Sequence, residues 1–224
     1  MKKLITFIWL LTISSLVLAN QTNLLPLGNP QVANKSVVKL INNNCHIDDY
    51  FGYTKKDWDK YNKRCVLSTF SQTPYYEILF DKVIENKKVY IFRSNKFNLY
   101  LKKTIDTFPS GDYIPKSKDT FEGIKESDAP NQFEITLFVE KSNKIINNLI
   151  VHFLKDYAGD LAQITLDFYI DKKLNIWLLE HGFDEEGASA MSWQHYHVED
   201  SGKFNLLDET NCHFEDGIVL LCDN

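Results

Sequence analysis

The chain has 224 residues, a formal net charge of −5, 44% hydrophobic residues and 25% charged residues, which are ordinary values for a globular protein. Its 15 Phe, 11 Tyr and 4 Trp supply enough apolar surface to exclude a disordered chain, and the acidic balance disfavours a nucleic-acid partner, whose phosphates need basic groups. Only Arg64 and Arg93 are arginines, so a site built from several bidentate guanidinium contacts is excluded.

The first 19 residues have the pattern of a secretory signal peptide. Two lysines precede the apolar run Leu4–Leu18, and a small residue, Ala19, follows at the expected cleavage position. The run is about 15 residues long, whereas a membrane-spanning helix needs about 20, so an N-terminal membrane anchor is the alternative. We expect cleavage after Ala19 and a periplasmic location. Cleavage removes two lysines and leaves a net charge of −7, and no later apolar segment predicts contact with a membrane.

The four cysteines predict disulfides. An even number of cysteines in an exported chain is typical of a disulfide-bonded protein. We expect the local pairs Cys45–Cys65 and Cys212–Cys222, because each closes a short segment. No C-x₂₋₄-C spacing is present, which disfavours the alternative of a zinc site.

The N-terminal half predicts two short helices. Residues 20–44 are rich in Asn, Gln and Pro and predict a loosely ordered lead-in, with a short strand at 37–41. Thr54 and Asp57 have the spacing of a capping box, which predicts a helix at 55–65. After strands at 75–84 and 88–93, apolar residues recur at helical spacing from Phe97 to Phe108 and predict a second helix at 94–108. Residues 109–131 then predict an exposed loop or hinge.

The C-terminal half has the alternating pattern of strands. Apolar and polar residues alternate from Phe133 onward, and turns of two to four residues separate the later segments, so neighbouring strands must pair antiparallel. The expected strands cover 133–140, 164–170, 174–178, 191–199 and 203–207. We therefore predict a single α+β domain at 45–224, with two short helices in its N-terminal half and an antiparallel meander in its C-terminal half.

Histidines and carboxylates gather near residue 180. His181 lies close to Asp184, Glu185 and Glu186, and His195 and His197 share one face of the next expected strand. Imidazoles and carboxylates can hold Zn²⁺ or Cu²⁺, so a metal site at His181, His195 and His197, in a metal-binding protein or metal-dependent hydrolase, is one interpretation. A polar strand face beside a solvated turn is the other. The consecutive acids do not have the alternating spacing of a calcium loop.

Catalytic motifs are missing from the sequence. It contains no G-x-S-x-G, no H-E-x-x-H, no P-loop and no G-x-G-x-x-G. We therefore expect a non-enzymatic protein without a cofactor.

Aromatic residues predict a contact surface. Trp177 falls on the strand face opposite Leu174, Ile176 and Leu178, and aromatic side chains rimmed by acids suit protein–protein contacts; a second apolar layer under the helix expected at 94–108 is the alternative. The predicted function is an exported protein-binding module, most concretely an inhibitor or immunity protein against a basic, envelope-acting toxin or hydrolase, where the word immunity rests on analogy of class. The predicted contact residues are Trp177, His181, Asp184, Glu185, Glu186 and Trp193.

Overall fold

The computed structural model describes residues 23–48, 52–72, 87–106, 131–157, 162–215 and 219–223. The expected signal peptide, the strand expected at 75–84 and all but the last residue of the loop expected at 109–131 lie outside these ranges. Within them, no helix is long and apolar enough to cross a membrane.

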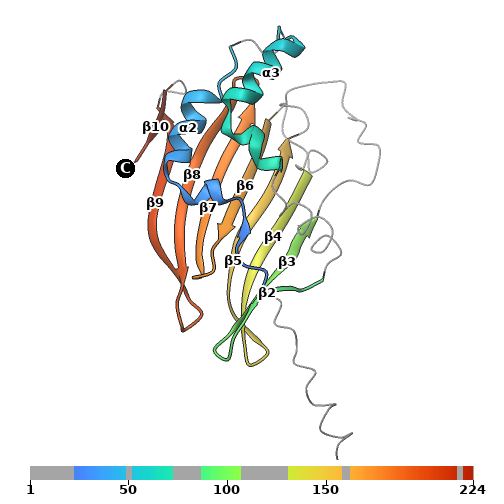
Figure 1. Cartoon of the computed structure of the whole chain (residues 1–224), viewed down its shortest axis with the longest axis vertical. Coiled ribbons are helices and arrows are strands. Elements are labelled where there is room, and N and C mark those ends of the chain that lie inside the picture. Colours follow the sequence, from blue (N-terminus) through green and yellow to red (C-terminus); the bar gives the residue numbers. More distant parts are fainter. Residues whose placement is uncertain are drawn as a thin grey trace, which may run out of the picture.

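In the described part of the chain, two α-helices and ten strands form an α+β fold, as the sequence predicts (Figure 1). The N-terminal elements are β1 (Leu27–Gly28), the 3₁₀ helix η1 (Pro30–Ala33), α2 (Ser36–Asn44), α3 (Lys55–Arg64) and the 3₁₀ helix η2 (Val66–Gln72). The strands that follow are β2 (Val89–Arg93), β3 (Asn98–Asp106), β4 (Asn131–Lys141), β5 (Lys144–Tyr157), β6 (Ala162–Ile170), β7 (Asn175–Asp184), β8 (Gly187–Val198), β9 (Phe204–Glu215) and β10 (Val219–Cys222).

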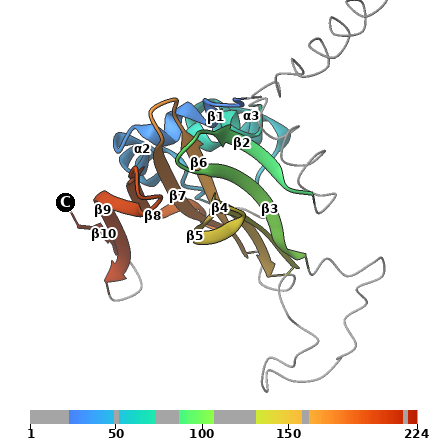
Figure 2. The same cartoon turned by 90° about the horizontal axis from the view of Figure 1, so that it is seen from below.

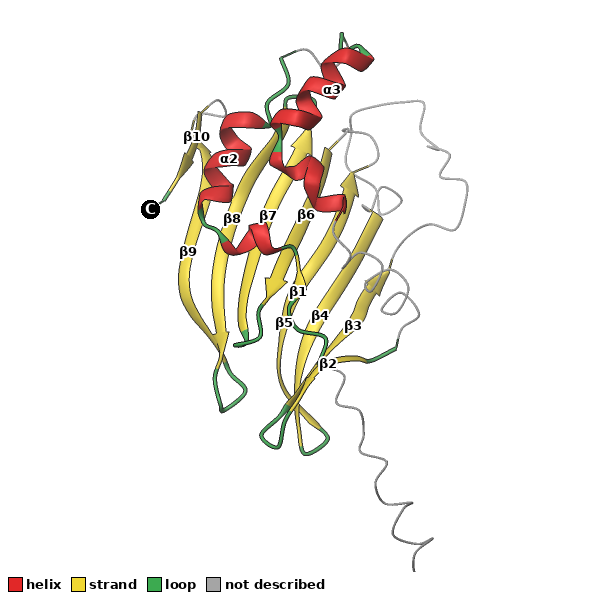
Figure 3. Cartoon of the chain, in the orientation of Figure 1, coloured by secondary structure: helices red, strands yellow, loops and turns green. Residues whose placement is uncertain are grey.

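The sheet is an antiparallel meander in which strands adjacent in sequence are adjacent in space. Its order runs from β10 through β9, β8 and so on to β2, and β1 pairs with the end of β6. The helical segments lie together along one side of this sheet, which curves as seen from below (Figures 2 and 3). The meander expected in the C-terminal half is confirmed, and it extends through β5 and β10, which the sequence pattern did not predict.

Apolar residues form two clusters, one on each side of the central strands. In β6, Leu166, Phe168 and Ile170 belong to the first cluster, together with residues of β2–β4, β7 and β8. The alternate side chains of β6, such as Tyr169, point to the helical side. There the second cluster joins Leu179 and Trp193 to the buried residues of η1, α2, α3 and η2.

The helix expected at 94–108 is wrong, because residues 98–106 form strand β3. Leu99 and Leu101 are buried in the first cluster, and Tyr100, between them, is buried on the other face, where it stacks on Phe138 at 5.1 Å. A strand with apolar residues on both faces loses its period of two, and the remaining spacing then imitates a helix.

The strand expected at 37–41 is also wrong, because these residues lie in α2. Val37, Val38 and Ile41 are buried on one side of that helix, which packs on β8. The Asn42 side chain accepts a hydrogen bond from the Ala190 amide at 2.7 Å. Burial thus outweighs the low helix propensity of β-branched residues, and much of the expected lead-in has regular structure.

The helix at 55–65 and both disulfides are confirmed. The Thr54 amide donates to the Asp57 carboxylate at 3.1 Å, and hydrogen bonds from Thr54 lower the pKa of Asp57, as a capping box requires. The disulfides join Cys45 to Cys65 and Cys212 to Cys222.

Candidate binding pocket and acidic turn

A pocket of about 290 Å³ lies between the sheet and the α3–η2 segment. Strands β5, β6 and β7 supply its floor, and α3 and η2, which run across the ends of β6 and β7 (Figure 1), supply its cover. The pocket is lined by Tyr61, Asn62, Cys65, Leu67, Ser68, Phe70, His152, Leu154, Gln163, Thr165, Asp167, His181 and Phe183.

One carboxylate and two imidazoles meet at the floor of this pocket. Asp167, in β6, has a side chain that is only 2% exposed. The Nε2 atom of His181, on the neighbouring strand β7, lies 3.0 Å from Asp167 Oδ2. The Nδ1 atom of His152, in β5, lies 3.9 Å from Asp167 Oδ1.

The hydrogen bonds fix where the imidazole protons lie. A carboxylate accepts and does not donate, so His181 Nε2 carries a proton and donates it to Asp167. His152 Nδ1 likewise donates to the Leu166 carbonyl oxygen, 2.6 Å away. In the neutral tautomer of His181, Nδ1 is then an acceptor; it is buried and has no hydrogen-bond partner among the described residues.

Burial favours the neutral forms of His152 and Tyr61, which also line the pocket. Burial of His152 lowers its pKa and outweighs the opposing effect of the Asp167 charge. Burial also raises the pKa of the Tyr61 phenol to about 12, so that this hydroxyl stays protonated. Among the described residues, the floor therefore combines the Asp167 carboxylate with two imidazoles.

The walls of the pocket are mainly apolar. The Phe70 ring stands edge-on to the His181 ring, with centroids 6.4 Å apart, and Leu67, Leu154 and Phe183 complete the walls. Ser68 donates to backbone carbonyls near the end of α3 and not to an imidazole. The pocket therefore combines apolar walls with a polar floor.

The predicted acidic residues form an exposed turn between β7 and β8 that is hydrogen-bonded to the Cys45–Ile47 segment. Asp184, Glu185 and Glu186 are all exposed, and the Asp184 carboxylate accepts the Glu186 amide at 2.8 Å. The Glu186 carbonyl accepts the Ile47 amide at 2.7 Å, and the Ala188 amide donates to the Cys45 carbonyl at 2.8 Å. We call residues 184–186 the acidic turn.

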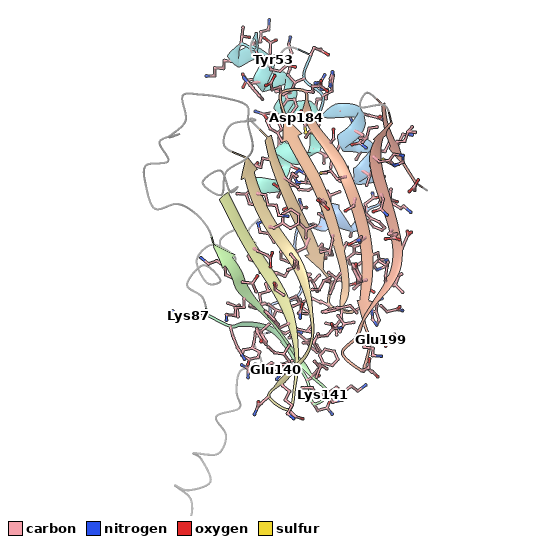
Figure 4. The ribbon with its side chains drawn as sticks, turned by 180° about the vertical axis from the view of Figure 1, so that it is seen from behind. Tyr53, Lys87, Glu140, Lys141, Asp184 and Glu199 are labelled. Atoms are coloured by element: carbon pink, nitrogen blue, oxygen red, sulfur yellow. A yellow bond between two sulfur atoms is a disulfide. The ribbon has the colours of Figure 1, made fainter. Side chains whose placement is uncertain are left out.

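The acidic turn and the pocket are neighbours. Phe183, which lines the pocket, immediately precedes Asp184. Cys65, which also lines the pocket, is bonded to Cys45, whose backbone holds the strand after the turn. Figure 4 shows Asp184 at the end of the molecule that carries Tyr53, and Glu199 at the opposite end.

The two predicted contact tryptophans lie beneath η1 and α2. Trp193 is 3% exposed, and its indole donates to the Val32 carbonyl at 2.8 Å. Trp177 stacks on His195 with ring centroids 4.6 Å apart, and burial lowers the pKa of His195. These rings therefore belong to a second apolar layer, which was the alternative to an exposed contact surface. The layer is covered by η1 and α2, and not by the helix expected at 94–108.

The three predicted metal-binding histidines are not grouped. His181 pairs across the strands with Ala190, whereas His195 pairs with Trp177, four positions away along β7; at about 3.3 Å per residue this separates the two backbones by roughly 13 Å. His197 instead lies beside Asn175, with His197 Nδ1 3.1 Å from its side-chain oxygen. Over the described ranges, no group of three His, Cys, Asp or Glu side chains is placed to hold a metal ion.

Sequence reasoning missed two residues at the floor of the pocket. His152 stands between Val151 and Phe153, and Asp167 between Leu166 and Phe168. A single ionisable residue inside an apolar strand signals a buried group that needs a polar partner, and that signal could have identified both.

Comparisons with protein-family profiles, with curated proteins and with solved structures find no match for this chain. The candidate site is thus defined by its own geometry, namely the pocket over Asp167 and the acidic turn beside it.

Proposed function

We propose that this protein is an exported, non-enzymatic protein-binding module that captures a basic partner at the end of the molecule formed by the acidic turn and the pocket. The observation that carries the proposal is the pocket over the buried carboxylate of Asp167, which adjoins three exposed carboxylates on a fixed turn. The pocket can accept one side chain of the partner, and the negative charges of the acidic turn can attract basic residues around that side chain.

Rigidity supports this assignment of the surface. A binding surface that is already ordered loses less conformational entropy when a partner docks. Two hydrogen bonds tie the acidic turn and its flank to Cys45 and Ile47, and the disulfide from Cys45 to Cys65 connects that segment to the pocket lining. The turn is therefore held in one shape before any partner arrives.

Charge supports the nature of the partner. The net charge of −5 becomes −7 once the two leader lysines are removed. An acidic protein attracts basic partners over long distances and accelerates their association at low salt. The most concrete form of the proposal is an inhibitor or immunity protein that neutralises a basic, envelope-acting toxin or hydrolase, and the two disulfides suit such an oxidising compartment.

The test compares two variants that lose the same charge, one in the acidic turn and one outside it. The turn variant carries Asp184→Asn, Glu185→Gln and Glu186→Gln; asparagine preserves the side-chain oxygen that accepts the Glu186 amide. The control variant carries Glu199→Gln, Asp200→Asn and Glu209→Gln, which are all exposed. Glu199 lies near the other end (Figure 4), and Glu209 lies midway along β9. Each variant and the parent protein are used to capture proteins from periplasmic extract at ~50 mM and ~500 mM salt.

We expect the parent and the control variant to retain the same basic protein at low salt and to lose it at high salt. The turn variant should retain at least tenfold less, because about 1.4 kcal/mol of lost attraction gives that factor. The captured protein, once purified, should also lose its lytic or hydrolytic activity when the parent protein is added. Equal capture by the turn variant contradicts the proposal.

A further inference from the structure

At the floor of the pocket, the Nδ1 atom of His181 is buried and has no hydrogen-bond partner among the described residues. The Nε2 atom of the same ring lies 3.0 Å from Asp167 Oδ2. An imidazole that donates through Nε2 and carries one proton presents Nδ1 as an acceptor. A buried polar atom of this kind costs free energy until a ligand or water satisfies it. The matching ligand group is therefore a hydrogen-bond donor.

We propose that the pocket binds a primary ammonium group carried on an apolar stem, which is the chemistry of a lysine side chain. This inference rests on the proposed function, because the lysine would belong to the captured partner. In the bound state the ammonium donates to His181 Nδ1, and its positive charge lies near the Asp167 carboxylate.

Charge selects an ammonium over other donors. Among the described residues that line the pocket, the ionisable groups at the floor and its cover are Asp167, His152, His181 and the Tyr61 phenol. Burial lowers the pKa of His152 and raises that of Tyr61. Among the described lining residues, Asp167 is the acidic group and none is a lysine or an arginine, so an ammonium group meets a complementary carboxylate there. Coulomb attraction is much stronger in a buried site than in water. A hydroxyl or amide donor gains none of this attraction, and a carboxylate ligand is repelled.

Shape selects a stem of the length and polarity of a lysine side chain. A volume of about 290 Å³ is at the small end of ligand pockets, so the site suits one side chain. Leu67, Phe70, Leu154 and Phe183 present apolar surface to that stem. Lysine buries its methylene groups against apolar surface while its charge finds polar partners.

The experiment is a titration of the full mature protein, followed through the imidazole signals of its histidines by NMR. The probes are n-butylammonium, an Nα-acetyl-lysine amide, the same amide with its side-chain amine acetylated, and n-butyrate. Three variants accompany the parent protein. Asp167→Asn removes the charge at constant shape, Gln163→Trp fills the pocket without touching its ionisable groups, and His46→Asn alters an exposed histidine outside it. Near-ultraviolet circular dichroism checks that each variant is folded.

We expect the ammonium probes to shift the His181 and His152 signals in a saturable way and to leave His46 unchanged. Acetylation of the amine and the Asp167→Asn change should each weaken binding at least tenfold, and Gln163→Trp should abolish it. Binding of the acetylated probe or of butyrate as tightly as the amine overturns the proposal. So does the lack of any saturable shift, or equal binding by the folded Gln163→Trp variant.

The probes also separate the two sources of an ammonium group. Binding of the lysine amide as tightly as n-butylammonium supports a protein side chain, whereas binding of n-butylammonium alone overturns the lysine assignment in favour of a small free amine. The readout is independent of the capture experiment. Failure of this titration with intact capture rejects the lysine pocket only, and failure of capture with an intact titration rejects the proposed function.

Discussion

Gly187 occupies the point where the strand after the acidic turn meets the backbone of the Cys45–Ile47 segment. Its φ is +109°, and a Cβ atom there would lie 2.1 Å from the Cys45 carbonyl oxygen. An alanine would suffer both the unfavourable backbone conformation and the clash. We expect Gly187→Ala to lower the free energy of unfolding by at least about 2 kcal/mol, measured by chemical denaturation.

Gly182, in the same strand pair, is the matched control. A Cβ atom at this position has ordinary contacts, the nearest being the Met191 sulfur at 3.6 Å. Gly182→Ala should therefore change the stability by less than about 1 kcal/mol. Equal losses for the two glycines would show that the turn is not held against Cys45 as described.

His152 makes stability depend on pH. Burial lowers its pKa from the ordinary 6.5, so below pH ~6.5 the unfolded chain binds a proton that the folded chain does not. Because the unfolded state then holds more protons, this contribution to stability is complete above pH ~6.5 and is lost as the pH falls, by up to ~1.4 kcal/mol per pH unit. Burial of His195 acts in the same direction.

Replacing His152 removes its contribution to the pH dependence of the free energy of unfolding. His152→Asn retains a donor for the Leu166 carbonyl but cannot take up the proton. Its stability, measured by denaturant titration from pH 8 to pH 5, should fall less steeply below pH ~6.5 than that of the parent. The exposed His46→Asn variant should follow the parent curve. A His152→Asn curve parallel to the parent would contradict the buried neutral imidazole.

Residue-level prediction from sequence was better for the turn than for the pocket. The acids at 184–186 stand together in a turn between two strands, so their exposure follows from local pattern. Asp167 and His152 lie on different strands, 15 positions apart in sequence. Whether their side chains meet depends on the register in which β5 pairs with β6. The local sequence pattern of each strand does not determine that register.

The disulfide between Cys45 and Cys65 connects the end of α2 to the end of α3. Both of its cysteines are at most 2% exposed, whereas Cys212 is only partly buried. The two bridges close segments with sequence separations of 20 and 10 residues, so each should stabilise by about 3 kcal/mol through the unfolded chain. Loss of the first also leaves a cavity in the core.

We therefore expect Cys45→Ala/Cys65→Ala to destabilise the protein more than Cys212→Ala/Cys222→Ala, by about 1 kcal/mol. Unfolding by guanidinium measures this difference. Amide exchange should also accelerate at Ile47 and Ala188 in the first variant, because their hydrogen bonds join the disulfide-bonded segment to the turn. Unchanged exchange there would mean that the disulfide does not hold the turn.

At the scale of elements, sequence pattern succeeded where one side of a segment is polar. β6 and β7 alternate clearly and were expected, as was α3 with its capping box. The pattern failed for β3, whose Leu99, Tyr100 and Leu101 are buried on two faces. It failed for β5 for the opposite reason, since Asn147 and Asn148 interrupt its apolar alternation near the exposed end.

At the end of the molecule remote from the acidic turn, segments that are distant in sequence contact one another. The β2–β3 connection meets the β8–β9 turn through an ion pair between Lys96 and Asp200. At Gly202, in the same turn, a Cβ atom would lie only 2.6 Å from the Ile146 side chain of β5. The amide of Leu24 bonds to the Ile91 carbonyl, and so joins the N-terminal segment to β2. The pocket and the acidic turn occupy the opposite end.

This arrangement makes a directional prediction about where a partner binds. The most direct test is hydrogen–deuterium exchange of the protein alone and in complex with a basic protein isolated by the capture experiment. We expect binding to slow exchange at residues 182–188 and in the α3–η2 cover of the pocket, and to leave exchange in the β8–β9 turn at 199–203 unchanged. Protection confined to the β8–β9 turn or to the β9 face, with the acidic turn unaffected, would contradict it.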